Sequence, residues 1–318
     1  MSIVRRMNLF ITSFMVVFPL ALKLLLGFTI RKTNILSLNT FKEFNKLIFT
    51  LFLPVLLFNN IYHSNMGEDF NGKLILFALI SLTLLFTLFM VFVPRIEKEN
   101  AKRGVMVQAM SRSNFILFGI PVANALYGEG SLGEATILVS FVVPLINVLS
   151  VIALEFFRNK KIHFLKILKG IITNPLIIAS MIAYLLVITD IPLPYMFDMF
   201  IVEIASIATP IALIILGGSV TFQTFHHNKV QLSIAIAGKL IIAPLIGISA
   251  AILIGFRNES LVILMAMFSS PTAVSSYSMA LNMDGDAELA GLIILFTTFL
   301  SIISLFFITF TLLAAGLI

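Results

Sequence analysis

Residues 111–128, SRSNFILFGIPVANALYG, interrupt a long apolar segment with an Arg, two Asn and a Gly-Ile-Pro sequence. A proline inside a helix removes a backbone hydrogen bond and clashes with the preceding turn. Because lipid offers no water to satisfy the freed groups, such a break is stable only where it is buried in protein or lines a wet cavity. A similar stretch, FSSPTAVSSYSMAL at 268–281, places Pro271 150 residues after Pro121. Two interrupted membrane helices in corresponding halves of a chain are typical of a transporter's binding site.

The composition is that of a polytopic membrane protein. Of 318 residues, 59% are hydrophobic and 11% are charged, whereas a soluble protein carries about 25% charged residues. The mean hydropathy is +1.09. The absence of Cys excludes disulfides, iron–sulfur clusters and thiolate zinc sites. The four His lie in predicted loops or at helix ends and do not cluster as a metal site would. We expect neither a metal site nor a resident cofactor.

Ten apolar segments approach the roughly 20 residues that a membrane helix needs. The first follows two Arg but runs to about Ile30 without a small-residue cleavage site, so we interpret it as a retained helix rather than a signal peptide. The sequence therefore predicts an all-α membrane protein. The expected spans are 8–30, 41–62, 74–94, 104–126, 135–157, 167–189, 197–220, 231–255, 261–281 and 289–314.

Basic residues in the loops predict the orientation, because they are enriched on the cytoplasmic side. One side carries 13 of them, namely Arg31, Lys32, Lys42, Arg95, Lys98, Lys102, Arg103, Arg158, Lys160, Lys161, Lys166, Lys169 and Lys229. The other side carries 4, namely Arg5, Arg6, Lys73 and Arg257. We therefore expect a multi-pass protein of the cell (plasma) membrane with both termini extracytoplasmic. These charges report orientation, and no nucleic-acid partner is expected.

The prolines indicate that the two halves of the chain repeat. Counterparts at offsets of 156, 156 and 150 residues are Pro19 and Pro175, Pro54 and Pro210, and Pro121 and Pro271. Each lies in the corresponding segment of its half. Because five is odd, the second half must enter the membrane in the opposite sense, which is an inverted repeat. The expected division is 1–157 for the first five-helix repeat, 158–166 for a cytoplasmic loop and 167–318 for the inverted second repeat.

Two basic residues lie deep in predicted spans. Arg112 precedes the Gly-Ile-Pro break by two turns. Intramembrane charge is costly and faces the protein interior or a water-filled path, so Arg112 either attracts an anion or ties helix ends together. Lys239 lies farther from its helix end, and a pair with Glu203 is one expectation for it. We interpret Gly217 and Gly218 as a packing device at a helix end.

The breaks predict a site for an anion. A proline fits the first turn of a new half-helix, so N–H groups and positive dipole ends after Pro121 and Pro271 would converge near the membrane midplane. Polar side chains around them either complete the site or only satisfy freed backbone groups; they are Asn114, Asn124, Ser269, Ser270, Thr272 and Ser275. Asn174 marks a third break, which either faces the same cavity or kinks its helix. The candidate substrate-binding residues are Arg112, Asn114, Gly119, Pro121, Asn124, Asn174, Ser269, Ser270, Pro271 and Thr272.

Motifs in both halves resemble the auxin efflux carrier family, which includes plant PIN-formed carriers and bacterial permeases. They are LLGFTIRK (25–32), LFLPVLLFNNI (51–61), SNFILFGIPVANALYG (113–128), NPLIIAS (174–180), PIALIILGGSV (210–220), GKLIIAPLIG (238–247) and SPTAVSSYSMAL (270–281). The resemblance implies ten helices in two inverted repeats, with helices 4 and 9 crossing at their prolines. It also implies a usually dimeric scaffold of helices 1, 2, 6 and 7, and a transport domain of helices 3–5 and 8–10. Asn114 and the backbone around Pro121 and Pro271 would bind a carboxylate. The short central loop is typical of a bacterial-type permease.

These features favour a secondary transporter that moves a small organic anion, a carboxylate, by elevator-type alternating access, as a homodimer in the lipid bilayer. The alternative is a cation- or proton-coupled antiporter of the crossover-helix type, which would want a carboxylate at the crossover. None stands beside Pro121 or Pro271, and H⁺ and Na⁺ stay open as coupling ions. The chain lacks paired intramembrane Asp, a Ser with a His and a His-Glu-x-x-His sequence, so we expect no enzyme.

Overall fold

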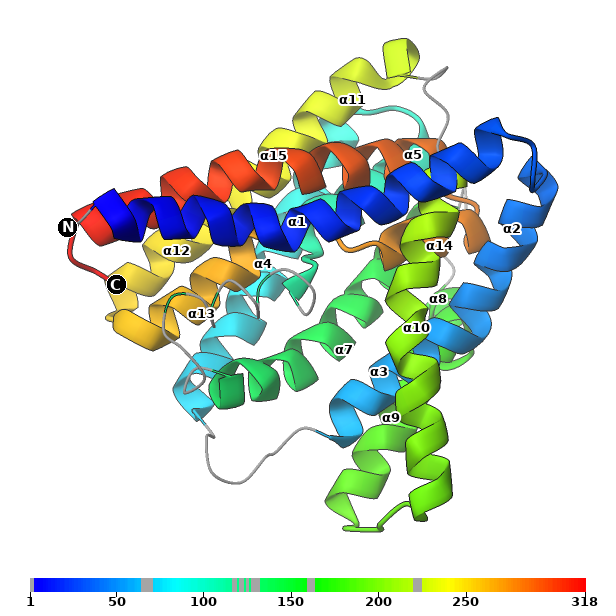
Figure 1. Ribbon diagram of the computed structural model, residues 1–318, viewed down its shortest axis with the longest axis horizontal. Coiled ribbons are helices and arrows are strands. Elements are labelled where there is room, and N and C mark those ends of the chain that lie inside the picture. Colours follow the sequence, from blue (N-terminus) through cyan, green and yellow to red (C-terminus); the bar gives the residue numbers. More distant parts are fainter. Residues whose placement is uncertain are drawn as a thin grey trace.

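The structure is a computed structural model that describes the backbone of residues 3–63, 71–115, 119, 123, 126, 132–158, 164–219 and 225–318, and the side chains of most of these from Phe18 onward. All regular secondary structure in these residues is helical (Figure 1). The helices of the first half are α1 (Ile3–Lys32), α2 (Leu38–Leu47), the π-helix η1 (Ile48–Phe52), α3 (Leu53–Tyr62), α4 (Gly72–Ile96), α5 (Asn100–Ser111) and α7 (Leu132–Arg158). Those of the second half are α8 (Phe164–Ile172), α9 (Pro175–Ile188), α10 (Tyr195–Ser219), α11 (Phe225–Ala237), the π-helix η5 (Gly238–Ile242), α12 (Ala243–Ile254), α13 (Asn258–Ser269), α14 (Ser275–Asn282) and α15 (Ala287–Ala314).

Long apolar helices confirm that this is an all-α membrane protein. In the described residues, six are long and apolar enough to cross a bilayer: Leu38–Tyr62, Gly72–Ile96, Ile137–Arg158, Tyr195–Ser219, Asn228–Ile254 and Ala287–Ala314. Three other predicted spans are divided. Span 104–126 leaves the α-helix after Ser111, span 167–189 is split before Pro175, and span 261–281 is split between Ser269 and Ser275.

Two π-helical turns keep long helices continuous through a proline. Pro54 lies in the first turn of α3, directly after η1, and Pro244 lies in the first turn of α12, directly after η5. A proline cannot donate the next helical hydrogen bond and crowds the preceding turn. The wider π turn shifts that bonding pattern by one residue, and the helix continues past the proline.

One packed group of helices is centred on α10, which contacts α1, α2 and α3, while α3 also packs on α9 (Figure 1). Glycines allow the closest approach. A Cβ atom on Gly27 would lie 1.8 Å from the carbonyl oxygen of Ile214, and one on Gly217 would lie 2.0 Å from that of Leu24. In lipid, small residues permit this backbone contact between helices, which confirms the packing role predicted for Gly217.

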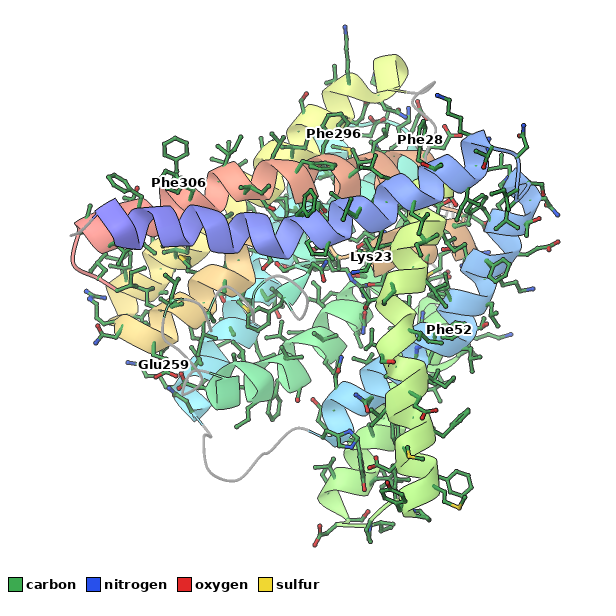
Figure 2. The ribbon with its side chains drawn as sticks, viewed as in Figure 1. Lys23, Phe28, Phe52, Glu259, Phe296 and Phe306 are labelled. Carbon is green, nitrogen blue, oxygen red and sulfur yellow. The ribbon has the colours of Figure 1, made fainter. Side chains whose placement is uncertain are left out.

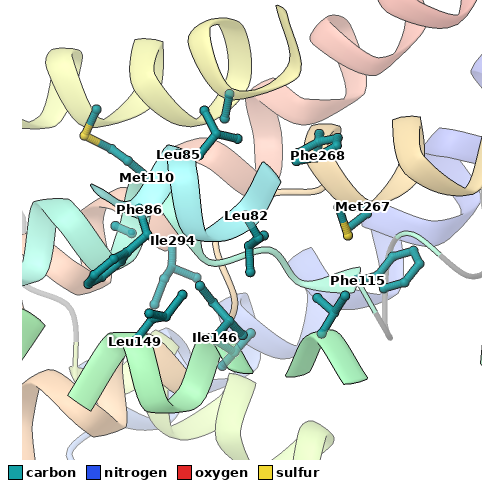
Figure 3. Close-up of a cluster of buried hydrophobic side chains, with 14 of the residues drawn as sticks. Leu82, Leu85, Phe86, Met110, Phe115, Ile146, Leu149, Met267, Phe268 and Ile294 are labelled. Carbon is teal, nitrogen blue, oxygen red and sulfur yellow. The ribbon is translucent and has the colours of Figure 1, made fainter. Parts of the chain in front are cut away.

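A second packed group brings α4, α5, α7, α13 and α15 together around an apolar core. Figure 3 shows this core, where Leu149 of α7 lies beside Ile294 of α15 and Met110 of α5 lies farther away. The neighbouring members of the cluster are Leu82, Leu85, Phe86, Phe115, Ile146, Met267 and Phe268. These side chains are almost entirely buried, so the group forms a continuous body that holds both broken helices.

The outside of the bundle is apolar. Phe28 on α1, labelled in Figure 2, is 41% exposed, and Leu253 on α12 is 86% exposed. Large exposed hydrophobic side chains on a soluble protein would drive aggregation, whereas in a bilayer they contact lipid tails.

Polar contacts between residues at the helix ends lie at two ends of the bundle. At one end, Arg158 pairs with Asp284 (2.5 Å) and Gln231 donates to Glu97 (2.6 Å). This is the end to which the charge count assigns the basic loops. At the other end Asn71, Glu134 and Ser260 hydrogen-bond to one another, and His63 pairs with Asp198 (3.0 Å).

Candidate functional site

The two interrupted helices cross through short extended segments. α5 ends at Ser111, and Arg112 is already extended (φ −90°, ψ 123°). α13 ends at Ser269, and Ser270 is likewise extended (φ −61°, ψ 146°). The segments pair as an isolated antiparallel bridge between Ser113 and Thr272, and the Asn114 N–H donates to the Pro271 carbonyl (2.8 Å). The crossing therefore satisfies part of its own backbone.

The position of the first break differs from the prediction. The sequence suggested that the half-helix carrying Arg112 and Asn114 continues to Gly119, but the chain leaves the helix at Arg112. The reason is the pairing with the second broken segment, which compensates the extended backbone of residues 112–114. Pro121 and Asn124 lie outside the described residues.

The role predicted for Pro271 also differs. It was expected to begin a half-helix, but α14 begins at Ser275 and Pro271 lies in the extended crossing. There its carbonyl accepts from Asn114, and its lack of an N–H costs no hydrogen bond. The N-terminal end of α14, at Val274 and Ser275, lies at the cavity described below. The positive end of a half-helix is thus at the site, although it starts four residues later than expected.

Arg112 is buried at the crossing, with 4% of its surface exposed. Its Nη1 donates to the Met279 sulfur (2.6 Å), and its Nη2 donates to Asn147 Oδ1 (2.6 Å) and Ser275 Oγ (2.7 Å). Within the described part of the chain no carboxylate pairs with it. A buried cation held only by neutral acceptors keeps its positive charge available to an anion.

Lys239 lies on the other side of the crossing, in the π-helix η5, and is 1% exposed. Its ammonium donates to Ser113 Oγ and, at 3.4 Å, to the carbonyl of Phe268 in the last turn of α13. The expected pair with Glu203 is absent among the described residues, because Glu203 lies exposed on α10. Lys239 therefore bonds to both broken helices.

A cavity of about 90 Å³ lies between the two packed groups. This is enough room for several waters. From the crossing it is lined by Arg112, Ser113, Asn114, Phe115, Ala273, Val274 and Ser275. Facing them are Leu53, Leu56, Leu57 and Asn60 of α3, Val143, Ile146 and Asn147 of α7, Leu176 of α9, and Thr209 and Ala212 of α10. The cavity is small and mostly apolar, and two of its polar lining residues, Asn147 and Ser275, hydrogen-bond to Arg112.

Three candidate hydroxyl residues lie at the crossing but not on the cavity. Ser270 Oγ donates to the Ala266 carbonyl (2.5 Å), and Thr272 Oγ1 donates to the Ala109 carbonyl (2.9 Å). These bonds satisfy the last carbonyls of α13 and α5. Ser269 is fully buried, and its hydroxyl has no partner among the described residues.

Two further candidates have local structural contacts. A Cβ atom on Gly119 would lie 2.3 Å from the ring of Phe115 and 3.1 Å from Ser270 Oγ, so a glycine lets the chain pack there. Asn174 is the N-cap of α9, and its side chain accepts from the Leu176 N–H (3.0 Å). Asn174 is absent from the cavity lining, which Leu176 joins.

Four polar residues that line the cavity were not among the candidates, namely Asn60, Ser113, Asn147 and Thr209. Asn60 and Asn147 had a usable signal, because each is an amide inside a strongly apolar span. Ser113 and Thr209 carry no such signal, since a hydroxyl in a membrane helix commonly bonds to its own backbone.

Residues 12–309 match a protein family that is described as membrane transport protein (Mem_trans). The chain belongs to this family. It is the auxin efflux carrier family, so the resemblance drawn from the motifs is confirmed and the protein is a transporter rather than an enzyme. Among curated relatives, an uncharacterized transporter of Methanothermobacter thermautotrophicus is 20% identical over 282 residues, which is 88% of this chain and 92% of the relative.

Among solved structures, this chain resembles the sodium proton antiporter MjNhaP1 from Methanocaldococcus jannaschii. The TM-score is 0.54 at 14% identity, covering 96% of this chain and all of the antiporter chain. At this identity the likeness concerns the fold alone. The membrane transporter therefore has an antiporter-like fold, with its broken helices crossing in the middle of the bundle.

Proposed function

We propose that this transporter moves a small organic anion with a carboxylate group, and that the cavity beside Arg112 is its binding site. The observation that carries this proposal is the buried Arg112, which has no carboxylate partner among the described residues. A guanidinium presents paired N–H donors that match a carboxylate. The Asn114 side chain and the N-terminal end of α14 line the same cavity and would add hydrogen bonds and positive potential.

Transport would proceed by an elevator movement of one packed group against the other. The scaffold would comprise α1–α3, α9 and α10, and the transport domain would comprise α4, α5, α7 and α11–α15. In support, the cavity lies between these groups. Ser278 of α14 also donates to Asn45 of α2 (2.7 Å), which is a polar contact that can break and re-form. The proposal also includes ten helices in two inverted repeats and extracytoplasmic termini. The protein would form a homodimer through the scaffold.

Binding to purified protein tests the site directly. We would measure ¹⁴C-labelled malonate, malate and acetate by equilibrium binding in detergent, and their uptake into proteoliposomes with imposed pH and Na⁺ gradients. Arg112→Gln should weaken anion binding by about 10- to 150-fold, since a hydrogen bond to a charged group contributes about 1.5–3 kcal/mol. Asn114→Ala should have an effect of similar size.

Arg112→Lys is the matched control, because it keeps the charge but loses the paired donors. It should bind better than Arg112→Gln and less well than the original chain. If folded Arg112→Gln binds every anion with unchanged affinity, Arg112 only ties the helices together. The binding site would then lie elsewhere.

A cation-coupled antiporter is the second candidate, since the chain has the fold of a sodium proton antiporter. A site for Na⁺ requires oxygen ligands, and carboxylates are the strongest of them. The described cavity lining contains no Asp or Glu, which favours the anion. Uptake of ²²Na⁺ without any organic anion would favour the antiporter instead.

A further inference from the structure

Ser113 lies between a buried ammonium and the cavity. Its hydroxyl oxygen accepts from Lys239 on the side of η5, while the residue itself lines the cavity between Arg112 and Asn114. Its backbone is held by the bridge to Thr272. Lys239 therefore holds the Ser113 hydroxyl, and the bridge holds its backbone. The same residue borders the cavity.

The hydrogen-bonding capacity of the two groups decides the direction of the hydroxyl proton. A lysine ammonium has three donors and no acceptor, and a serine hydroxyl has one proton and two lone pairs. Since the ammonium takes one lone pair of Ser113, the hydroxyl proton cannot point back at Lys239. In the described part of the chain this hydroxyl has no protein acceptor. The cavity that Ser113 lines is a place where an acceptor can sit.

We propose that Ser113 donates its hydroxyl proton to the carboxylate of the bound anion, and that Lys239 is a positioning residue that holds the hydroxyl in this orientation. This inference rests on the anion site proposed above. The buried ammonium also withdraws electron density from the Ser113 oxygen, which makes the hydroxyl a stronger donor. The anion would thus be bound by Arg112 directly and by Lys239 through Ser113.

The charges around this pair are consistent with anion binding. Lys239 hydrogen-bonds to the Ser113 hydroxyl and the Phe268 carbonyl, and Arg112 is the other buried cation of the crossing. No ion pair between Lys239 and a carboxylate is present among the residues with described side chains. Two buried cations without acidic partners give this region a positive potential that an anion offsets.

The alternative is that Lys239 only clamps the two broken helices by its bonds to Ser113 and Phe268. The two roles differ in what Ser113 does. If Lys239 is a clamp alone, removing the Ser113 hydroxyl lowers stability and leaves the affinity of folded protein unchanged. If Ser113 donates to the anion, its removal lowers the affinity of folded protein.

The test measures binding of ¹⁴C-malonate, ¹⁴C-malate and ¹⁴C-acetate to detergent-solubilised full-length protein, with thermal unfolding as the fold readout. Ser113→Ala should weaken binding by about 10- to 150-fold. Ser111→Ala is the matched control. This serine is two residues away, and its hydroxyl donates to the Val107 carbonyl of its own helix (2.8 Å), so its loss should leave affinity unchanged.

A double-mutant cycle tests the coupling of the two residues. Lys239→Met should weaken binding in the original chain and have much less effect in the Ser113→Ala background. Lys239→Arg keeps a donor and a charge, so it should recover part of the affinity. A merely structural lysine would show neither this coupling nor this rescue at the level of affinity.

Wild-type affinity in folded Ser113→Ala overturns the inference and leaves the anion site intact. Independent effects of the two substitutions overturn the positioning role of Lys239. If Lys239→Met does not fold, Lys239→Arg in both serine backgrounds replaces it in the cycle. Failure of the original chain to bind any of the three anions overturns the proposed function itself, and this inference with it.

Discussion

At the scale of single residues, the two asparagines of the cavity have opposite bonding states. Asn147 Oδ1 accepts from Arg112 (2.6 Å), whereas Asn60 Nδ2 is buried without a partner among the described residues. A buried amide that lacks a partner lowers stability, and one that pairs a cation raises it. The same residue type therefore has two different bonding states in the lining of one cavity.

We predict that Asn60→Ala weakens anion binding without lowering thermal stability, because no described bond of its Nδ2 donor is lost. Asn147→Ala should lower the melting temperature as well, since it leaves the buried Arg112 with fewer acceptors. Binding assays and thermal unfolding on the same preparations check both. Equal loss of stability in the two variants would show that Asn60 has a structural partner.

At the scale of the elements, the crossing of α1 and α10 depends on glycines. Gly27→Ala should lower stability by about 1–3 kcal/mol or more, because its Cβ would lie 1.8 Å from a backbone oxygen that cannot move independently of its helix. Leu25→Ala is the control, as this side chain of the same helix is 56% exposed. Thermal unfolding in detergent measures both, and a stable Gly27→Ala would contradict the close approach.

The carboxylate of Glu97 joins the end of α4 to α11. It accepts from the N–H groups of Lys98 (2.6 Å) and Glu99 (2.7 Å) and from Gln231 (2.6 Å). Burial alone would raise the pKa of Glu97, but these hydrogen bonds and the nearby Lys102 outweigh it and lower the pKa below 4.5. The carboxylate form is thus favoured in the folded protein.

A lowered folded-state pKa stabilises the protein above the ordinary carboxyl pKa, and this stabilisation is lost as the pH falls through the lowered value. Glu97→Gln should therefore reduce the melting temperature at pH 7, and the difference from the original chain should shrink as the pH falls below about 4.5. Melting curves between pH 3.5 and 8 check this. A difference independent of pH would show that Gln231 and the backbone bind glutamine equally well.

The sequence predicts the helices better than it predicts the crossing. Continuous spans such as α4 and α15 follow from one requirement, a length of about 20 apolar residues. The break after Ser111 does not have such a local cause. It depends on pairing with residues around Thr272, far along the chain, while the visible Gly-Ile-Pro sequence lies farther on. Likewise, polarity alone found Arg112 and Asn114 but could not separate them from Ser270 and Thr272, whose hydroxyls bond to backbone.

At the scale of the whole molecule, the charge count assigns the described loops around Lys98 and Asp190 to opposite sides of the membrane. We predict that Cys introduced at Lys98 is labelled only from the cytoplasm and Cys at Asp190 only from outside. Both positions are exposed, and the chain has no Cys of its own. Labelling of intact cells and of inverted vesicles with a membrane-impermeant maleimide measures this, and the reverse pattern would invert the proposed topology.

The π-helix η5 predicts a difference between homologous sequences. A π turn contains one more residue than an α turn, so η5 corresponds to a single-residue insertion in an α-helix. Removing that residue would rotate everything before it by about 100° relative to α12, and Lys239 would no longer point at Ser113. A homologue without the insertion, recognisable by a one-residue gap near 238–242, should therefore have lost the basic side chain at this position or gained one on a neighbouring turn. Homologues would then differ in the length of this helix. Those with the extra residue would have two buried cations at the crossing, and those without it would have one.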